Sequence, residues 1–120
     1  MNPMRIMIVD DNELMRKEIS KSVALQTDAV LECEDGESAI VRCLDFNPDW
    51  ILMDIKMKKM NGIIAAEKIK AVTPEVNIAI VTSYDSYLYR DAAKKLGIKH
   101  FFMKTNLLDI RRVLDSNRQK

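Results

Sequence analysis

Cysteine, histidine and glycine are scarce in this sequence, and each shortage excludes a class of site. The 120 residues include two cysteines, one histidine and three glycines. Cys33 and Cys43 lack the spacing of a metal or redox motif, and His100 has no second histidine with which to share a metal. We therefore expect a reduced, cytoplasmic protein in which both cysteines are buried as small hydrophobic residues.

A charge of one sign and a long hydrophobic run are also missing. Lysine and arginine together number 19 and aspartate and glutamate 18, which gives a net charge of +1. Proteins that bind nucleic acid usually carry a basic face, so we expect no direct nucleic-acid contact by this domain. No apolar run approaches the roughly 20 residues that cross a bilayer, and the N-terminus becomes acidic too early for a signal peptide. Neither membrane insertion nor secretion is expected.

The remaining composition is that of a globular domain. Hydrophobic residues make up 48% of the chain and charged residues 31%, which allows a sizeable core and argues against disorder. The length fits one domain, and we find no repeat or interdomain linker. We predict a single domain over residues 1–120, with residues 116–120 as a polar tail or the stub of a linker.

Five apolar segments alternate with five segments of helical periodicity. Such alternation predicts a parallel sheet with helices on both faces. Runs such as IAIV are apolar at successive positions, as expected for strands buried on both sides. The predicted strands are Arg5–Asp11, Ala29–Gly36, Trp50–Met53, Asn77–Ser83 and His100–Lys104.

The helices are predicted from apolar residues that recur at helical spacing. Gly97 is expected to end the fourth helix as a C-terminal cap. In the second helix, the residues expected to face the core are Ala39, Ile40, Cys43 and Leu44. The predicted helices are Glu13–Gln26, Glu37–Asp45, Ile63–Ala71, Asp85–Leu96 and a last one marked by Leu107, Ile110, Val113 and Leu114.

Polar residues stand at the ends of four predicted strands. Because ligands of open parallel sheets bind beyond the carboxyl ends of the strands, these side chains are expected along one edge. Taken singly, each has an ordinary interpretation: an aspartate caps a helix or forms a turn, and a lysine or threonine is simply solvated. The residues in question are Asp10, Asp11, Asp54, Thr82, Ser83 and Lys104.

Taken together, these residues predict phosphoryl transfer to an aspartate. Crowded carboxylates repel, so one keeps its proton or a cation joins them. Mg²⁺ suits such oxygen ligands, with Mn²⁺ as a possible substitute, and leaves positions open for phosphate oxygens. A lysine and a threonine hydroxyl can bind further phosphoryl oxygens, while a carboxylate can act as the nucleophile.

The segments MIVDDN, ILMDIKMKKMNG, IVTS and FFMK resemble the conserved blocks of receiver domains from two-component response regulators. They occur in the family's order and at its spacing, from Arg5 to about Leu114. The resemblance implies an α/β fold of the flavodoxin-like type. In this fold a doubly wound sheet of five parallel strands, in the order 2-1-3-4-5, is flanked by five helices.

The resemblance also implies roles for the acidic residues. Asp54 corresponds to the phosphoacceptor. Asp10 and Asp11 would hold the Mg²⁺, with Asp54 and the backbone carbonyl of Lys56 as further ligands.

Five residues would bind, sense or tune the phosphoryl group. Thr82 and Lys104 would bind its oxygens, and Thr82 and Phe101 would form the switch that changes the face of the fourth helix, fifth strand and fifth helix. Lys56 and Tyr84 lie two residues beyond Asp54 and Thr82 and would tune the lifetime of the phosphoryl group.

The implied function is that of a signalling switch. A sensor histidine kinase or a phosphotransfer protein would donate the phosphoryl group. The domain would promote its own phosphorylation and dephosphorylation without being a turnover enzyme, and would control an output partner or domain, with transcription among the outputs. A homodimer formed on phosphorylation is compatible with the resemblance.

Two positions depart from the family's pattern. Lys58 stands where the family usually has proline after the loop methionine, and Thr105 stands where it often has proline after Lys104. A cis peptide bond after that lysine is usual for the family, and the cis form is costly before a residue other than proline. Receivers joined to helix-turn-helix output domains often lack the second proline, which favours that subgroup.

Three other functions fit parts of the pattern. A small Mg²⁺-dependent phosphatase with an aspartate nucleophile usually has a second acid at the position of Lys56. A nucleotide- or flavin-binding module would need a glycine-rich loop after the first strand, where this chain has acids that repel phosphate. A degenerate receiver that acts by interaction alone would not need the full set of reacting groups.

Overall fold

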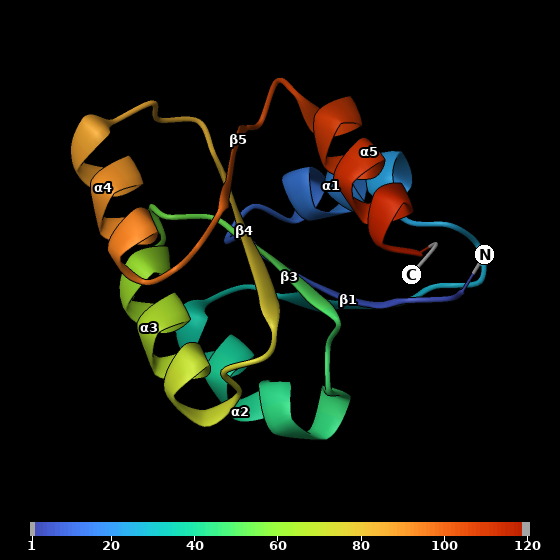
Figure 1. The fold of residues 1–120 in the computed structure, drawn as a ribbon, viewed down its shortest axis with the longest axis horizontal. Helices are drawn as coiled ribbons and strands as arrows, with labels where there is room; N and C mark the ends of the chain where they lie inside the picture. The colour runs from blue at the N-terminus through green and yellow to red at the C-terminus, as the bar shows by residue number, and fades with distance from the viewer. Residues whose placement is uncertain (1, 119–120) are drawn as a thin grey trace.

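Five parallel strands form the centre of the fold, in the order β2-β1-β3-β4-β5 (Figure 1). The computed structural model describes residues 2–118. The predicted sheet and strand order are confirmed. The strands are β1 Arg5–Val9, β2 Ala29–Cys33, β3 Trp50–Met53, β4 Asn77–Thr82 and β5 His100–Met103.

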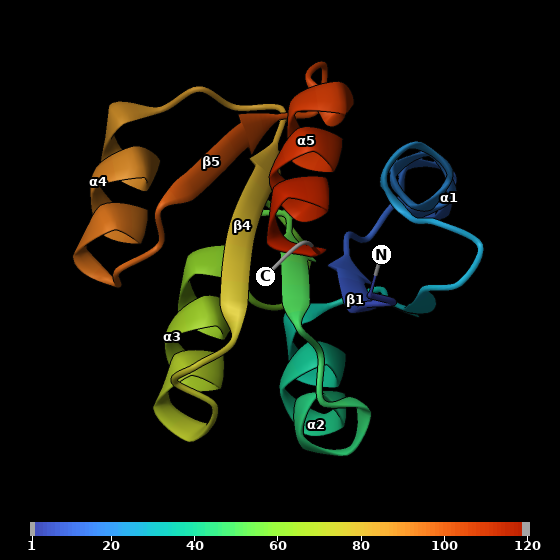
Figure 2. The ribbon, with the colours of Figure 1, turned by 45° about the vertical axis from the view of Figure 1, so that its right-hand side comes forward.

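Five helices alternate with the strands and cover both faces of the sheet (Figures 1 and 2). On one face α2, α3 and α4 pack over a core that includes Cys43, Ala65 and Ala93. On the other face α1 and α5 pack over a core that includes Ile19 and Leu114. The helices are α1 Glu13–Val23, α2 Gly36–Phe46, α3 Gly62–Val72, α4 Tyr87–Lys95 and α5 Leu107–Arg118.

The strands are apolar at successive positions because each one contributes to both cores. Along β1, Met7 and Val9 face the core under α2, α3 and α4, whereas Ile6 and Ile8 face the core under α1 and α5. Strand β3 is buried at all four residues. Side chains that alternate between two covered faces produce the continuous hydrophobic runs seen in the sequence.

Several predicted elements are too long, because side chains cap or turn the chain earlier than hydrophobicity indicates. Strand β1 ends at Val9, since the Asp10 carboxylate accepts the N–H of Asn12 and turns the backbone. Strand β2 ends at Cys33, because Asp35 caps α2 by accepting the N–H of Ser38. Capping residues therefore set the boundaries that the apolar pattern left open.

Three further predictions are wrong in detail. Leu44 is 64% exposed rather than buried, because the inward stripe of α2 is formed by Gly36, Ala39 and Cys43. Residues 116–118, expected in a polar tail, continue α5; residues 119–120 of the expected tail lie outside the described residues. Helix α4 begins at Tyr87 instead of Asp85, since Asp85 precedes the helix and pairs with Arg90.

The order of the strands makes two loops diverge from neighbouring strand ends. The chain leaves β1 toward α1 on one face of the sheet and leaves β3 toward α3 on the other. Strands β1 and β3 are neighbours, so their carboxyl ends lie side by side while the loops diverge. Such a point is where open α/β sheets bind ligands. Among residues 2–118, no helix combines the length and hydrophobicity needed to span a membrane.

Candidate functional site

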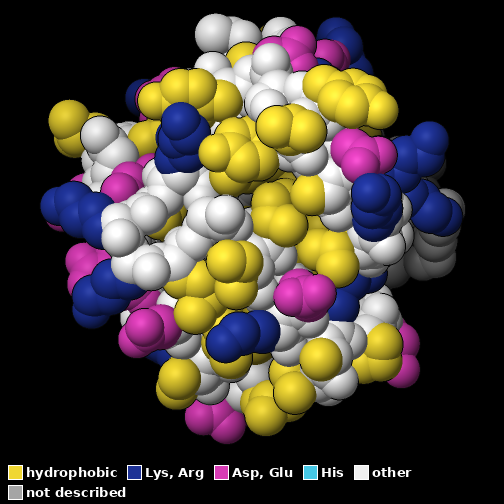
Figure 3. All heavy atoms as spheres, turned by 90° about the vertical axis from the view of Figure 1, so that its left-hand side faces the viewer, with side chains coloured by type: hydrophobic (Ala, Val, Ile, Leu, Met, Phe, Trp, Pro, Cys, Tyr) yellow, Lys and Arg dark blue, Asp and Glu magenta, His cyan; other side chains and the backbone are white. Residues whose placement is uncertain are grey.

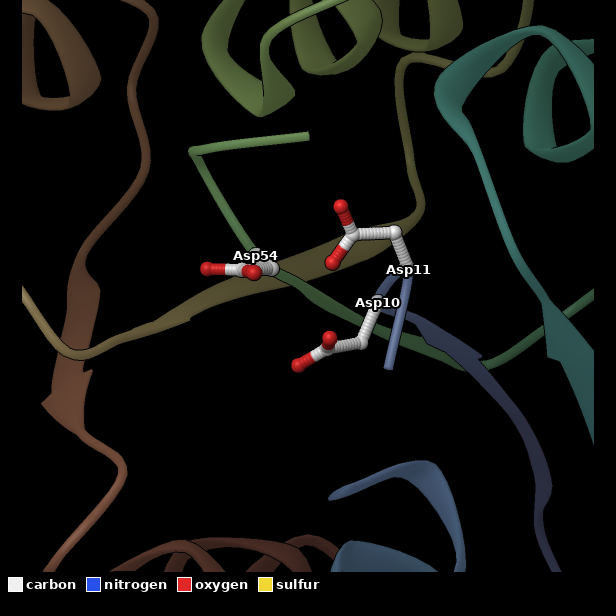
Figure 4. Close-up of side chains that lie close together, drawn as sticks. All are labelled: Asp10, Asp11 and Asp54. Atoms are coloured by element: carbon white, nitrogen blue, oxygen red, sulfur yellow. The ribbon is translucent and has the colours of Figure 1, made fainter. Parts of the chain in front are cut away.

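Three aspartates converge at the carboxyl ends of β1 and β3 (Figure 4). Val9 pairs with Met53 in the sheet, so Asp10 and Asp54 follow two paired residues. Asp11, Asp10 and Asp54 each offer a carboxylate oxygen, and these oxygens all lie within 4.8 Å of one another. Asp10 and Asp54 are buried, whereas Asp11 is exposed. The structure thus brings together the three acids that were predicted from the sequence to lie along one edge of the sheet.

Lys104 reaches this cluster from the end of β5. Its backbone N–H donates to the carbonyl of Thr82 at 2.8 Å, which extends the pairing of β4 with β5 by one step. The Lys104 Nζ lies 2.9 Å from Asp10 Oδ2 and 3.1 Å from Asp54 Oδ2, and the side chain is only 18% exposed. One ammonium group is therefore shared by two buried carboxylates.

The carboxylates of the cluster are incompletely hydrogen-bonded. Asp10 Oδ1 accepts the N–H of Asn12, and Asp54 Oδ1 accepts the N–H of Ile55, each at 2.9 Å. Asp10 Oδ2 is buried and has no hydrogen-bond partner within the described residues. Its contact with Lys104, at 2.9 Å, is an ion pair. A buried carboxylate oxygen without a directed donor is costly.

The surroundings raise the pKa values of both Asp54 and Lys104. Burial raises the pKa of Asp54 to about 6, with Asp10 adding to the rise and Lys104 opposing it. Burial alone would lower the pKa of Lys104, but its contacts with Asp10 and Asp54 outweigh that effect and raise it. Lys104 is therefore a stable cation, and Asp54 is an unusually basic carboxylate.

The donor set of the acid cluster fits a hard divalent cation. Three carboxylates face one lysine, and the buried Asp10 Oδ2 has a free lone pair. Oxygen ligands of this kind suit Mg²⁺ or Mn²⁺. Asp10, Asp11 and Asp54 are the side chains that could hold such an ion.

Thr82 and Tyr84 lie on the neighbouring strand end and loop. Thr82 is fully buried at the end of β4, and its hydroxyl accepts the N–H of Tyr84 at 3.2 Å. Lys56, in the loop after Asp54, places its Nζ 4.1 Å from the centre of the Tyr84 ring. The loops that follow β3 and β4 are therefore connected beside the acid cluster.

Phe101 lies on β5 opposite Ile80 and is half-buried. The Arg90 guanidinium lies 4.4 Å from the centre of the Phe101 ring, and its Nε donates to Asp85 at 2.7 Å. The face on the side of α3 and α4 carries hydrophobic side chains interspersed with lysine and arginine (Figure 3). Tyr87 on α4 is 79% exposed, as a partner surface would require.

Gly62 is a site residue that the sequence interpretation did not include. A Cβ at this position would lie 1.8 Å from the backbone carbonyl oxygen of Asp54, so any other residue would displace the Asp54 backbone. The Gly62 N–H also donates to the carbonyl of Ile55 at 2.8 Å. Its place in the block MNG, at the start of α3, was the available signal.

Two remaining features lie at the two ends of β5. Among residues 2–118 no peptide bond is cis, so the bond between Lys104 and Thr105 is trans. His100 lies at the opposite end of β5 from Lys104, between the rings of Trp50 and Phe102. His100 therefore packs among aromatic side chains.

A known protein family matches most of the chain. The family model described as "Response regulator receiver domain" matches residues 6–115.

Curated relatives extend beyond the length of this chain. The response regulator protein VraR of Staphylococcus saprophyticus is 36% identical over 107 residues, which cover 86% of this chain and 50% of that protein. The transcriptional regulatory protein DegU of Brevibacillus brevis is 32% identical over 105 residues, which cover 86% of this chain and 44% of that protein. The chain thus spans about half the length of these relatives.

Solved structures agree on the fold. The CheY-like receiver domain protein of Methanospirillum hungatei has a TM-score of 0.89 at 21% identity, covering 98% of this chain and 95% of that one. The signal receiver domain of the NarL response regulator of Mycobacterium tuberculosis has a TM-score of 0.85 at 20% identity, covering 99% and 98%.

Proposed function

This chain belongs to the response regulator receiver domain family, and we propose that it is a switch phosphorylated on Asp54. The observation that carries the proposal is the position of Asp54. It is buried beside two other acids and a lysine, at the carboxyl edge of the sheet. Such an arrangement suits a nucleophile that must meet a metal ion and a phosphoryl group together.

The chemistry requires one bond to form and one to break. An Asp54 oxygen attacks phosphorus as the bond to the donor's leaving group breaks, and an acyl phosphate results. Lys104 and Thr82 bind phosphoryl oxygens. Asp10, Asp11, Asp54 and the Lys56 carbonyl would hold Mg²⁺, which neutralises charge on the phosphoryl oxygens when bound.

Phosphorylation changes the arrangement of the α4, β5 and α5 face through Thr82 and Phe101. The Thr82 hydroxyl turns toward the new phosphoryl group, and the half-buried Phe101 ring moves into the space that it leaves. The population then shifts toward a second arrangement of the α4, β5 and α5 face. The observation in support is that Thr82 is buried at the strand end beside Lys104.

Partners follow from the chemistry and the family. The donor is a phosphohistidine on a sensor kinase or phosphotransfer protein, and the chain alters its own phosphorylation state without steady turnover of a substrate. VraR and DegU are named as regulators, so the output includes transcription, through a DNA-binding partner or domain. We assign residues 1–120 to one domain that works in the cytoplasm and can form a homodimer when phosphorylated.

Binding of a phosphoryl mimic tests the acceptor. With Mg²⁺ and beryllium fluoride at ten times its dissociation constant, the protein should gain about 1.4 kcal/mol of stability in a thermal melt. Asp54→Asn should abolish this gain, since the mimic attaches to the carboxylate. Exposure to acetyl phosphate should add one phosphoryl mass to the wild type alone. Labelling that persists in Asp54→Asn would reject Asp54 as the acceptor.

A further inference from the structure

The loop that carries Asp10 and Asp11 is tied to the rest of the molecule by Arg16. This residue lies on α1, and its Nη1 donates to the backbone carbonyl of Asp10 at 2.8 Å. Its Nε donates to Glu32 on β2 at 3.0 Å. The Arg16 side chain is only 12% exposed. One planar guanidinium therefore connects the acid loop, the first helix and the edge strand.

The Asp10 carbonyl is at a point where the sheet stops providing partners. The Asp10 N–H still donates to the carbonyl of Cys33, but β1 ends at Val9 and the chain turns toward α1. A backbone carbonyl that leaves a ladder needs another donor, and Arg16 supplies it. The orientation of this peptide determines where the side chains on both sides of it point.

We propose that Arg16 is a positioning residue for the metal-binding acids. Its guanidinium holds the Asp10 peptide against Glu32, so that the carboxylates of Asp10 and Asp11 converge with Asp54 on a divalent cation. The inference rests on the proposed function, because it concerns the same site. Groups that orient metal ligands by hydrogen bonds, without touching the metal, typically contribute ten- to hundredfold to metal affinity.

A simple charge effect would act in the opposite direction. The positive charge of Arg16 repels a dication, so its removal would tighten metal binding if charge alone mattered. Glu32 is ion-paired with Arg16 and with Lys17, which reduces the net charge near the acids. A test must therefore keep the positive charge at position 16 and remove only the simultaneous hydrogen bonds to the Asp10 carbonyl and Glu32.

Arg16→Lys satisfies that requirement. A lysine keeps the charge, but its ammonium lacks the planar fork that reaches the Asp10 carbonyl and Glu32 together. Lys17→Met is the matched control, because Lys17 also pairs with Glu32, at 2.7 Å, but is 63% exposed. Affinity is measured with Mn²⁺ by electron paramagnetic resonance, which needs no phosphorylation.

We expect Arg16→Lys to weaken Mn²⁺ binding about tenfold, equally at low and high salt because the loss is geometric. Lys17→Met should stay within about twofold of the wild type, since a surface ion pair contributes little. If Arg16→Lys lowers the melting temperature but leaves the Mn²⁺ affinity unchanged, Arg16 is merely structural and the proposal is overturned.

Asp11→Asn separates this inference from the proposed function. Loss of Mn²⁺ binding in Asp11→Asn, with normal binding by the wild type, places the ion at the acid cluster and makes the Arg16→Lys result decisive. A wild type that binds no Mn²⁺, or an Asp11→Asn variant that binds as well as the wild type, overturns the metal site and the role of Arg16 with it.

Discussion

Two clusters of buried charge lie at opposite ends of the sheet. At the carboxyl end, Asp10 and Asp54 share Lys104. At the amino end, Asp28, which precedes β2, meets Arg118 from the last turn of α5. Both clusters combine acids with a basic side chain away from water, yet they differ in how far the protein itself satisfies the acids.

The Asp28 carboxylate has four donors. Oδ1 accepts the N–H of Met4 at 2.9 Å and Arg118 Nη1 at 2.6 Å, and Oδ2 accepts the N–H of Leu25 at 2.8 Å and Arg118 Nη2 at 2.5 Å. Burial alone would raise the pKa of Asp28, but these hydrogen bonds outweigh burial and hold it below its usual value. The pair is complete without any ligand.

The cluster at the carboxyl end is short of donors and of positive charge. One lysine serves two carboxylates, a third acid lies beside them, and burial raises the pKa of Asp54 to about 6. The contrast teaches that burial alone does not make an ion pair functional. A pair that the protein satisfies fully stabilises the fold, whereas a pair left unsatisfied is prepared for a ligand.

The largest predicted effect belongs to the complete pair. Arg118→Met leaves the Asp28 carboxylate buried without its main partner, so the free energy of unfolding should fall by about 3–5 kcal/mol. Urea denaturation without metal measures the loss. Asp115→Asn is the control, because Asp115 also bonds Arg118, at 3.1 Å, but is 31% exposed; it should cost less than about 1 kcal/mol. Similar losses of stability in Arg118→Met and Asp115→Asn would show that the buried pair of Arg118 with Asp28 is no more stabilising than an exposed ion pair.

At the cluster of Asp10, Asp54 and Lys104, by contrast, a substitution is predicted to increase stability. A carboxyl group whose pKa is raised on folding destabilises the fold once it is ionised, so Asp54→Asn should increase the free energy of unfolding at pH 8 in EDTA. A rise from 3.8 to about 6, which already includes the opposing effect of Lys104, corresponds to a gain of about 3 kcal/mol. Urea denaturation against the wild type measures it, and a loss of stability would show that Lys104 already satisfies Asp54.

The two clusters also differ in how well sequence predicts them. The acid cluster was predictable because Asp10, Asp11 and Asp54 each follow an apolar strand, and parallel strands bring such ends to one edge. The family resemblance then supplied the strand order, which the structure confirms. The roles assigned to these residues stay predictions.

Residues that act over long separations were not predictable. Asp28 and Arg118 are 90 positions apart, and Arg118 occurs in a polar stretch that resembles a tail. Arg16 and Leu44 likewise have ordinary helical positions, and only packing decides that the first reaches a backbone carbonyl and the second faces water. A pattern along the chain identifies faces and edges, but it does not identify which distant group completes a hydrogen bond.

A third prediction concerns acid. The pKa of Asp28 is lowered on folding, so its stabilising contribution is fully present above the unfolded value of about 4 and is lost as the pH falls through the folded value. Asp28→Asn should therefore reduce the stability difference between pH 5 and pH 2.5, which urea titrations at the two pH values measure. Glu32→Gln should act in the same direction, because hydrogen bonds from Lys17 and Arg16 outweigh burial and lower the pKa of Glu32. If Asp28→Asn shows the same stability difference between the two pH values as the wild type, the ionised Asp28 carboxylate does not stabilise the fold.

The smallest effect is expected from the contact between Lys56 and Tyr84, in the loops beside the acid cluster. The Lys56 ammonium lies 4.1 Å from the centre of the Tyr84 ring and so connects the loops that follow β3 and β4. A contact of this kind is worth roughly 0.5–1 kcal/mol at an exposed site, which corresponds to about two- to fivefold in rate. We expect the pair to restrict the approach of water to the phosphoryl group, so Tyr84→Leu should shorten its lifetime by that factor.

Intact mass spectrometry measures that lifetime after acetyl phosphate is removed. Tyr87→Leu is the matched control, since Tyr87 is 79% exposed at the start of α4 and should leave the lifetime unchanged. Lys56→Met should reproduce the effect of Tyr84→Leu, and the double variant should add nothing further if the two side chains act as one barrier. Additive effects would instead mean that each residue acts on the phosphoryl group separately, and the lifetime would then be set by two independent contacts at the edge of the acid cluster.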